Sequence, residues 1–184
     1  MEFIEGRLKG VFVIRLKAFP DHRGFFMRVY DDALFETYGI SREWLQENHS
    51  LSVRKGTVRG LHFQLPPFDE TKLVRCIRGS IYDVFVDIRP SSDTFGQWDS
   101  IVLSAENRQM IYIPRGFAHG FCTLEDNCEV LYKADNVYSP EYERGILWND
   151  EDLNINWPVD VTVLSQKDMG NMTWKGFISN ELRV

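Results

Sequence analysis

The segment TVRGLHFQ, residues 57–64, places an arginine, a glycine and a histidine inside a run that is otherwise typical of a β-strand. A second segment, GFAHGF at residues 116–121, repeats the combination of glycine, histidine and aromatic residues farther along the chain. Glycine and charged groups are unfavourable inside a strand unless a ligand or another backbone must approach closely there. The two segments together predict a pocket inside a β-barrel, lined by histidines and cations.

The spacing of Arg59 and His62 raises a geometric question. Strict alternation along a strand sends side chains three positions apart to opposite faces. The two residues therefore serve one pocket only if the strand bulges or twists between them; otherwise Arg59 reaches a neighbouring site. Gly60 is where we expect a bulge, because glycine tolerates the backbone angles that bulges require.

Turn signals recur along the chain, and long stretches of helical periodicity are scarce. A short helix is expected over residues 31–38, capped by Asp31 or Asp32 and stopped by Gly39. Roughly the last forty residues indicate irregular structure that wraps the barrel, with a short terminal helix. We therefore predict one all-β domain over residues 1–184 with a few short helices. The expected strands cover residues 10–15, 56–65, 72–78, 80–89, 99–103, 109–113, 119–123 and 128–134.

The run at residues 80–89 has two different faces. Its even-numbered positions from 82 to 88 are all apolar, whereas the odd-numbered positions include Asp83, Asp87 and Arg89. A solvated outer face would explain these charges. The interior of a ligand-holding barrel would explain them equally well.

Composition excludes several classes of function. A chain of 184 residues with 43% hydrophobic and 26% charged residues is ordinary for a soluble globular protein. A net charge of −6 argues against a general nucleic-acid binder. No apolar run is long enough to span a bilayer, and no secretory signal is visible at the start. The three cysteines lack metal-site spacing, which favours buried thiols in a reducing cytosol. We expect a cytoplasmic protein without nucleic-acid or membrane partners.

A series of short motifs runs through the chain in a fixed order. The motifs are DxRGxF (21–26), NxSxS (48–52), RGLHFQ (59–64), KLVR (72–75), DVxVDIR (83–89), TFGxW (94–98), PxGFAHGF (114–121) and LSxKD (164–168). With them the chain resembles the cupin-fold nucleotide-sugar epimerases typified by dTDP-4-dehydrorhamnose 3,5-epimerase. The resemblance implies a cupin, or double-stranded β-helix (jelly-roll), barrel. It also implies an enzyme that epimerises a nucleotide-linked 4-keto-6-deoxyhexose in deoxysugar synthesis, without a metal or an organic cofactor.

The resemblance assigns four catalytic residues. His62 matches the base that removes a proton from carbon, and Asp168 matches the carboxylate that orients this histidine. Tyr132 matches the acid on the opposite face of the sugar, and Lys72 matches the cation beside the C4 oxygen. The chemistry fits, because a histidine suits a base near neutral pH and a fixed cation stabilises the developing enolate.

The resemblance also implies the substrate contacts and the oligomeric state. The expected contacts are Arg23, Arg59 and His119 for the diphosphate and sugar, Tyr138 for stacking on the base, and Gln46, Asn48, Glu143 and Lys167 for lesser contacts. The family is homodimeric with N-terminal strands exchanged between subunits. Residues 12–14 could form such a strand, so that Arg23 or Arg28 acts in the pocket of the partner.

Five of these residues also have a purely structural interpretation. His119 could cap a tight turn at residues 116–120, Lys72 could be an edge lysine, Asp168 could be a helix N-cap, Tyr132 could be a core aromatic, and Tyr138 could be loop packing.

Arg28 departs from the family, most members of which carry glutamate at this position. One interpretation places Arg28 at a sheet edge with no role in recognition. The other is a changed nucleobase, because arginine donates hydrogen bonds where a carboxylate accepts them. On that hypothesis the substrate is CDP- or GDP-linked, and the alternative function is a C5-only epimerase of such a sugar. The motifs themselves leave open whether C3, C5 or both are inverted.

Two other functions remain as rivals, and a third is disfavoured by the histidine pattern. A 3,4-ketoisomerase on the same fold needs a different histidine arrangement. A non-catalytic cupin that binds sugar nucleotides needs no pair of base and acid. A metal-dependent cupin usually offers His-x-His, which this chain lacks.

Overall fold

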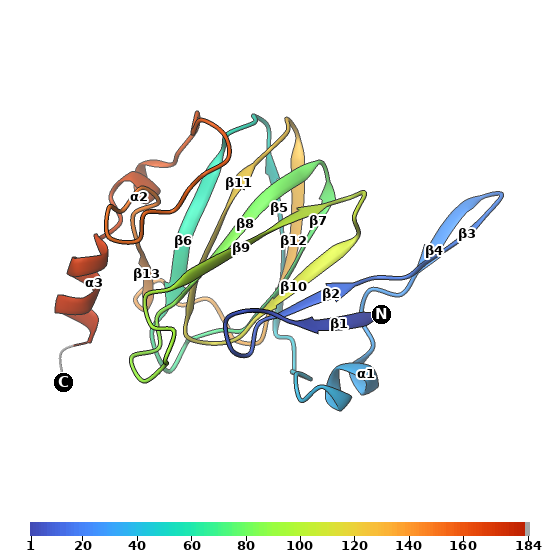
Figure 1. The fold of residues 1–184 in the computed structure, drawn as a ribbon, viewed down its shortest axis with the longest axis horizontal. Coiled ribbons are helices and arrows are strands. Elements are labelled where there is room, and N and C mark those ends of the chain that lie inside the picture. Colours follow the sequence, from blue (N-terminus) through green and yellow to red (C-terminus); the bar gives the residue numbers. More distant parts are fainter. Residues whose placement is uncertain (183–184) are drawn as a thin grey trace.

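The computed structural model describes residues 1–182, which form mainly two antiparallel β-sheets that face each other (Figure 1). The larger sheet has six strands in the order β1-β2-β10-β7-β12-β5, and the smaller has five in the order β13-β6-β11-β8-β9. The predicted all-β architecture with a few short helices is thus confirmed. The strands are β1 (Glu2–Glu5), β2 (Phe12–Arg15), β3 (Ala18–Asp21), β4 (Gly24–Met27), β5 (Gln46–Ser52), β6 (Val58–Gln64), β7 (Lys72–Arg78), β8 (Ser80–Asp87), β9 (Trp98–Ser104), β10 (Gln109–Ile113), β11 (Phe117–Thr123), β12 (Cys128–Ala134) and β13 (Glu143–Gly145). The helices are α1 (Asp32–Thr37), α2 (Gln166–Met169) and α3 (Trp174–Glu181).

The interior of the barrel is apolar over most of its length. Side chains from both sheets interdigitate there, among them Val74, Ile111 and Val130 from the larger sheet and Phe85 and Phe121 from the smaller. Burial of such residues is the main favourable contribution to folding.

The structure shows which way the charged face of β8 points. Asp83, Phe85 and Asp87 are buried, and Phe85 packs in the apolar cluster between the sheets, so the mixed face points into the barrel. Val84 and Val86 on the other face are buried as well, because the C-terminal segment covers the outside of the smaller sheet. Asp83 and Asp87 are therefore buried charges of the barrel interior and do not lie on a solvated surface.

The C-terminal segment wraps the outside of the smaller sheet, as expected. Trp174 and Phe177 of α3 pack with Leu61 and Phe63 of β6 in a second apolar cluster, and Figure 1 shows α3 outside β6 and β13. The expected helix near residue 31 is confirmed as α1, whose N-cap Asp31 accepts a hydrogen bond from the Leu34 N–H.

β5 is the one long strand that was not predicted. Its burial alternates, with Gln46, Asn48 and Ser50 partly covered and the residues between them exposed. The inward side chains are polar, so the apolar alternation that reveals a half-buried strand is missing. β5 pairs with β12 and completes the larger sheet at its edge.

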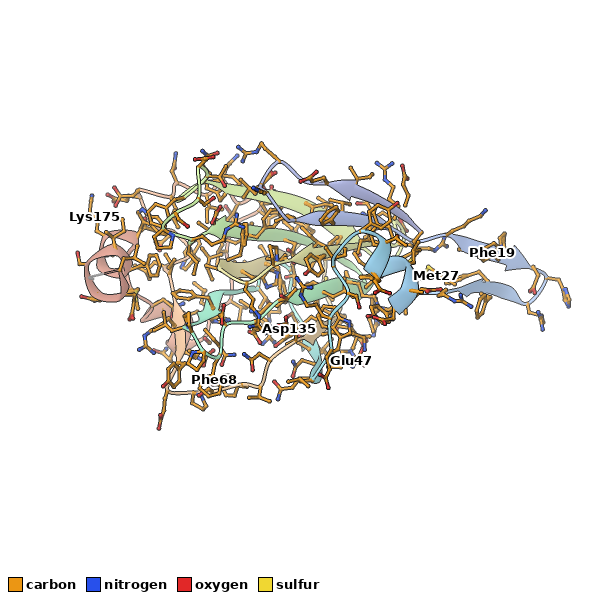
Figure 2. The ribbon with its side chains drawn as sticks, turned by 90° about the horizontal axis from the view of Figure 1, so that it is seen from below. Phe19, Met27, Glu47, Phe68, Asp135 and Lys175 are labelled. Atoms are coloured by element: carbon orange, nitrogen blue, oxygen red, sulfur yellow. The ribbon has the colours of Figure 1, made fainter. Side chains whose placement is uncertain are left out.

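The β3–β4 hairpin projects away from both sheets (Figure 1). Figure 2 shows Phe19 and Met27 on this projection, at the opposite end of the molecule from Lys175 on α3. We expected residues 12–14 to form a strand that is exchanged with the partner subunit, and the structure differs. These residues form β2, which pairs with β10 of the same chain, where Ile14 is fully buried and Phe12 packs against the same apolar cluster.

Candidate active site

Two adjoining cavities open between the sheets. The larger has a volume of about 500 Å³ and the smaller about 280 Å³. His62, Lys72 and Tyr132 line both of them and so stand at their junction. The larger cavity is also lined by Arg59, His119, Lys167 and Asp168, and the smaller by Gln46, Asn48, Tyr138 and Glu143.

All the predicted site residues except two therefore converge on these cavities. The exceptions are Arg23, in the turn of the β3–β4 hairpin, and Arg28, just after β4. Arg23 pairs with Asp21, and the Arg28 Nη1 atom lies 2.8 Å from Asp31 Oδ2. Arg28 thus engages the cap of α1, and nothing in the cavities of its own chain supports a role in reading the nucleobase.

The predicted bulge in β6 is present at Gly60. Opposite β11, His62 pairs with His119 and Arg59 pairs with Phe121, so β6 contains one residue more than its partner between these pairs. Gly60 has φ +115°, and a Cβ atom there would lie 2.6 Å from the His119 carbonyl oxygen. Only glycine fits, and the extra residue brings Arg59 and His62 to the same cavity.

His62 and Asp168 form a hydrogen-bonded pair at the junction of the cavities. His62 Nε2 lies 2.5 Å from Asp168 Oδ1, and the two side chains are 29% and 5% exposed. Burial alone would raise the pKa of Asp168, but hydrogen bonds from His62 and Ser165 outweigh it and lower the pKa. With Nε2–H donating to a carboxylate, Nδ1 carries the lone pair of the neutral ring.

Asp168 is not a helix N-cap. Ser165 caps α2, and its hydroxyl accepts the backbone N–H of Asp168, which is the third residue of the helix. The cap orients this short helix so that the Asp168 side chain points to β6. A hydrogen bond from the backbone N–H of Gly60 also helps to lower the pKa of Asp168.

Tyr132 lies on β12 of the larger sheet, whereas His62 lies on β6 of the smaller one. The two side chains therefore approach a common space from opposite sheets. Burial, together with the negative charges of Glu70 and Glu143, raises the pKa of Tyr132. The phenol thus keeps its proton at neutral pH and can act as an acid.

Lys72 is almost fully buried in β7, a strand in the middle of the larger sheet, so it is not an edge lysine. Its Nζ atom lies 3.2 Å from Glu70 Oε1, and both side chains are mostly buried. Sequence reasoning missed Glu70, although a residue two positions before Lys72 is expected on the same side of an extended chain. The carboxylate holds the ammonium at the junction of the cavities.

His119 stands in the middle of β11 and does not cap a turn. Its Nε2 atom lies 2.9 Å from Asp83 Oδ2, and the side chains are 9% and 0% exposed. Asp83 was not among the predicted site residues. Its position on the mixed face of residues 80–89 was the available signal, but its partner depends on the pairing of β8 with β11.

Tyr138, Glu143 and Lys167 form a chain of contacts at the smaller cavity. The Tyr138 hydroxyl donates to Glu143 Oε2 at 2.6 Å, and Lys167 Nζ lies 2.5 Å from the same oxygen. Burial would raise the pKa of Glu143, but the hydrogen bonds from Lys167 and Tyr138 lower it more. Hydrogen bonding to the Glu143 carboxylate raises the pKa of Tyr138.

Arg59 reaches the rim of the larger cavity, where β5 holds it. Its Nε donates to Ser52 Oγ at 3.0 Å and its Nη2 donates to the Leu51 carbonyl oxygen at 3.0 Å. Fixing one side of a guanidinium leaves its other donors to bind an anion such as a phosphate.

Among residues 1–182, no group of three or more histidine, cysteine, aspartate or glutamate side chains is arranged to hold a metal ion. No helix in this part of the chain is long and apolar enough to cross a membrane. The absence of a cofactor requirement stays a prediction from the sequence.

Comparison with known proteins identifies the family. The family model described as dTDP-4-dehydrorhamnose 3,5-epimerase matches residues 5–176. The dTDP-4-dehydrorhamnose 3,5-epimerase of Shigella flexneri is 50% identical over 170 residues, covering 92% of this chain and 93% of the relative.

Solved structures agree with this result. The enzyme of the same name from Bacillus anthracis, with TDP and PPi bound, has a TM-score of 0.91 and 44% identity over 94% of this chain and 98% of its own. The dTDP-6-deoxy-D-glucose-3,5-epimerase from Legionella pneumophila, in complex with dTDP-4-keto-L-rhamnose, has a TM-score of 0.89 and 38% identity over 94% and 92%.

A more distant neighbour has a narrower activity. It is a 3'-monoepimerase from Streptomyces bikiniensis in complex with dTDP-quinovose, with a TM-score of 0.88 and 29% identity over 96% of this chain and 89% of its own. The proteins named here bind or act on dTDP-linked compounds, and none supports a CDP or GDP preference. The fold is the expected cupin barrel, and the chain belongs to the dTDP-4-dehydrorhamnose 3,5-epimerase family.

Proposed function

We propose that this chain inverts C3 and C5 of a dTDP-linked 4-keto-6-deoxyhexose. The observation that carries the proposal is the placement of a His62–Asp168 pair on one sheet and a protonated Tyr132 on the other, around one cavity junction. Epimerisation next to a ketone needs a base on one face of the sugar and an acid on the other. This arrangement supplies both.

The reaction proceeds through an enolate. His62 takes the proton from the carbon next to the ketone, and the electron pair of the broken C–H bond moves to the C4 oxygen. The Lys72 ammonium stabilises this negative oxygen; a fixed charge or donor in such a position typically lowers the barrier by about 3 kcal/mol. Tyr132 then gives its proton to the opposite face of the carbon. The resulting imidazolium and phenolate return to their starting states by proton exchange with water.

The nucleotide end of the substrate has its own partners. Arg59, Lys167 and His119 line the larger cavity and are suited to the diphosphate and the sugar. Tyr138 is 53% exposed beside the smaller cavity, which leaves a face of its ring free to stack on the thymine. The Bacillus anthracis structure holds TDP and PPi and the Legionella pneumophila structure holds a dTDP-linked keto sugar, which supports this ligand class.

Inversion at both carbons is the outcome that the relatives favour. The Shigella flexneri and Bacillus anthracis proteins, at 50% and 44% identity, are named 3,5-epimerases, whereas the 3'-monoepimerase is only 29% identical. C3 and C5 both flank the C4 carbonyl, so the same enolate chemistry serves each carbon.

Incubation in D₂O with the dTDP-linked 4-keto sugar, followed by ¹H NMR, tests this function. We expect deuterium at C3 and at C5 together with the inverted configuration at both carbons. Label at one carbon alone would mean a monoepimerase. Binding without any exchange would mean a sugar-nucleotide-binding cupin.

We further propose a homodimer built through the β3–β4 hairpin. Phe19, Phe25 and Phe26 are all exposed on this projection, and exposed aromatic residues are enriched at protein interfaces. Docking on a second copy would carry Arg23 towards the pocket of that copy. Light scattering after gel filtration should give twice the chain mass, and Phe26→Asp should give a monomer; an unchanged dimer in the variant would contradict the use of the hairpin.

The remaining expectations concern the setting of the enzyme. A cofactor-independent epimerase of this class belongs in the cytoplasm, where nucleotide sugars for surface polysaccharide are made. Fractionation of the cells that make this protein, followed by detection with an antibody, tests the location directly.

A further inference from the structure

Gln64 closes the motif at residues 57–64 but has no task in the reaction described above. It ends β6, and it is buried with only 5% of its surface exposed. Its Nε2 donates to the Phe68 carbonyl at 2.8 Å and to the Val137 carbonyl at 3.2 Å, and its Oε1 accepts the Ser139 N–H at 2.6 Å. One side chain thus fastens two loops, residues 65–71 and 135–142, to each other.

Two of these hydrogen bonds hold the residues on either side of Tyr138. Val137 is fixed through its carbonyl and Ser139 through its N–H, while Gln46 Oε1 accepts the N–H of Tyr138 itself at 2.9 Å. Three consecutive backbone positions are therefore held by side-chain amides. The Tyr138 ring that they carry remains half exposed at the smaller cavity.

The same loop is fixed at two further points. Asn136 Nδ2 donates to the carbonyls of Pro67 at 2.9 Å and Asp69 at 3.1 Å. β13 pairs with β6 so that Glu143 lies directly opposite Gln64, and Glu143 accepts the Tyr138 hydroxyl. Gln64 thus neighbours both the backbone under Tyr138 and the residue that holds its hydroxyl.

We propose that Gln64 is a positioning residue for nucleotide recognition, acting through the backbone on both sides of Tyr138. The inference rests on the proposed stacking of Tyr138 on the base. An aromatic surface that is already held in place binds its ligand without first losing conformational freedom, so the clamp contributes to affinity. The role belongs to binding and not to proton transfer.

The hydrogen-bond pattern explains why the residue is glutamine. The position must donate to two carbonyls and accept from one N–H, and a primary amide does both. Glutamate has the same shape and keeps the acceptor for Ser139, but it places a carboxylate next to the Phe68 and Val137 carbonyls. Gln64→Glu is therefore a nearly isosteric change that removes the hydrogen bonds to the Phe68 and Val137 carbonyls.

A double-mutant cycle on dTDP binding tests the inference. The dissociation constant for dTDP is measured by calorimetry for wild type, Gln64→Glu, Tyr138→Ala and the double variant. We expect Gln64→Glu to weaken binding about 10-fold and Tyr138→Ala at least as much, because the stacking of an aromatic ring on a base contributes directly to affinity. The double variant should bind no more weakly than Tyr138→Ala alone.

Two controls separate positioning from general damage. Inorganic pyrophosphate should bind Gln64→Glu as tightly as wild type, since it engages the cations and not Tyr138. Asn107→Asp changes an amide with a similar set of backbone hydrogen bonds at the turn between β9 and β10, and it should leave dTDP binding unchanged.

Three outcomes would overturn the inference. If Gln64→Glu weakens dTDP binding equally with and without the Tyr138 ring, Gln64 acts by a route that does not involve Tyr138. If a folded Gln64→Glu variant binds dTDP as tightly as wild type, Gln64 has no role in nucleotide binding. An unchanged affinity in Tyr138→Ala would instead overturn the stacking role, and the inference with it. If Gln64→Glu does not fold, Gln46→Leu removes the acceptor for the Tyr138 N–H and should give the same coupling.

Discussion

Two histidine–carboxylate pairs stand directly opposite each other on neighbouring strands of the smaller sheet. His62 on β6 and His119 on β11 are register partners, and each uses Nε2 to contact an aspartate. They differ in access. The His62 ring is 29% exposed and lines both cavities, whereas the His119 ring is 9% exposed and lines only the larger one.

The two carboxylates also come from different parts of the fold. Asp83 belongs to β8, the strand next to β11, so its pair forms within the sheet itself. Asp168 comes from α2 in the segment that wraps the sheet from outside, where Val163 forms a bridge with Thr57. The comparison shows that a histidine–aspartate pair can serve different tasks, depending on how accessible its histidine ring is from the cavity. An accessible ring can take a proton from a substrate, whereas a buried pair fixes a wall of the cavity.

Replacing each histidine with asparagine should give the largest difference in activity between the two pairs. We expect His62→Asn to lower kcat by about 10³- to 10⁴-fold, because the base is lost. His119→Asn should cost only about 10-fold, mostly in KM, because a wall contact changes. Steady-state kinetics and dTDP calorimetry on both variants measure the split, and equal losses in kcat would erase the distinction between the pairs.

Removing the acid tests whether the His62 pair can act without its partner on the other sheet. Tyr132→Phe should lower the rate of inversion by about 10²- to 10³-fold, because no group delivers a proton to the opposite face. Deuterium should still enter the substrate from the side of His62, without inversion. NMR in D₂O separates the two events; loss of exchange together with inversion would mean that Tyr132 does more than reprotonate.

Substitution of the two aspartates should also lower kcat more in the His62 pair than in the His119 pair, but with smaller losses than substitution of the histidines. Asp168→Asn keeps the shape of the pair and removes the charge that orients and stabilises protonated His62, so we expect kcat to fall by about 10²-fold. Asp83→Asn should raise KM several-fold and leave kcat within about 3-fold of wild type. Thermal unfolding serves as the control, and a larger kcat loss in Asp83→Asn would reverse the assignment of the pairs.

Much of this arrangement could be predicted from the sequence where residue chemistry and local spacing are decisive. Gly60 was expected as a bulge because Arg59 and His62, three positions apart, can share a pocket only if the strand departs from strict alternation, and the register of β6 confirms the bulge. Most of the long strands followed from β-like runs that lie between recurring turn signals. The convergence of the candidate residues came from resemblance, since spacing alone does not tell which distant loop carries Asp168.

The rest depended on information that no local pattern holds. β5 escaped prediction because its inward side chains are polar cavity walls, so the apolar period of a half-buried strand is absent. Asp83 and Glu70 were missed because their partners are fixed by strand pairing and loop path. Residues 12–14 looked like an exchangeable strand, but they pair with β10 of their own chain and Ile14 is buried there.

The smallest expected effect concerns stability in acid. Burial raises the pKa of Asp168, but hydrogen bonds from His62 and Ser165 lower it more strongly. The pKa of Asp168 in the folded protein therefore lies below the ordinary value of 3.8. Such a group stabilises the fold above that ordinary value, and the contribution is lost as pH falls through the folded value. Asp168→Asn should therefore cost about 1–3 kcal/mol near neutral pH and progressively less below about pH 4.

Asp87 provides a matched control outside both pairs. Burial raises its pKa, but hydrogen bonds from Arg89, Ser92 and Thr94 outweigh this and lower the value to about 2. The cost of Asp87→Asn should then fall progressively from about pH 4 and be lost as pH passes below about 2. Urea unfolding of both variants and wild type across the acid range compares the two carboxylates. A cost of Asp168→Asn that does not change with pH would show that its charge adds nothing to the fold, and that the accessible pair is held by shape alone.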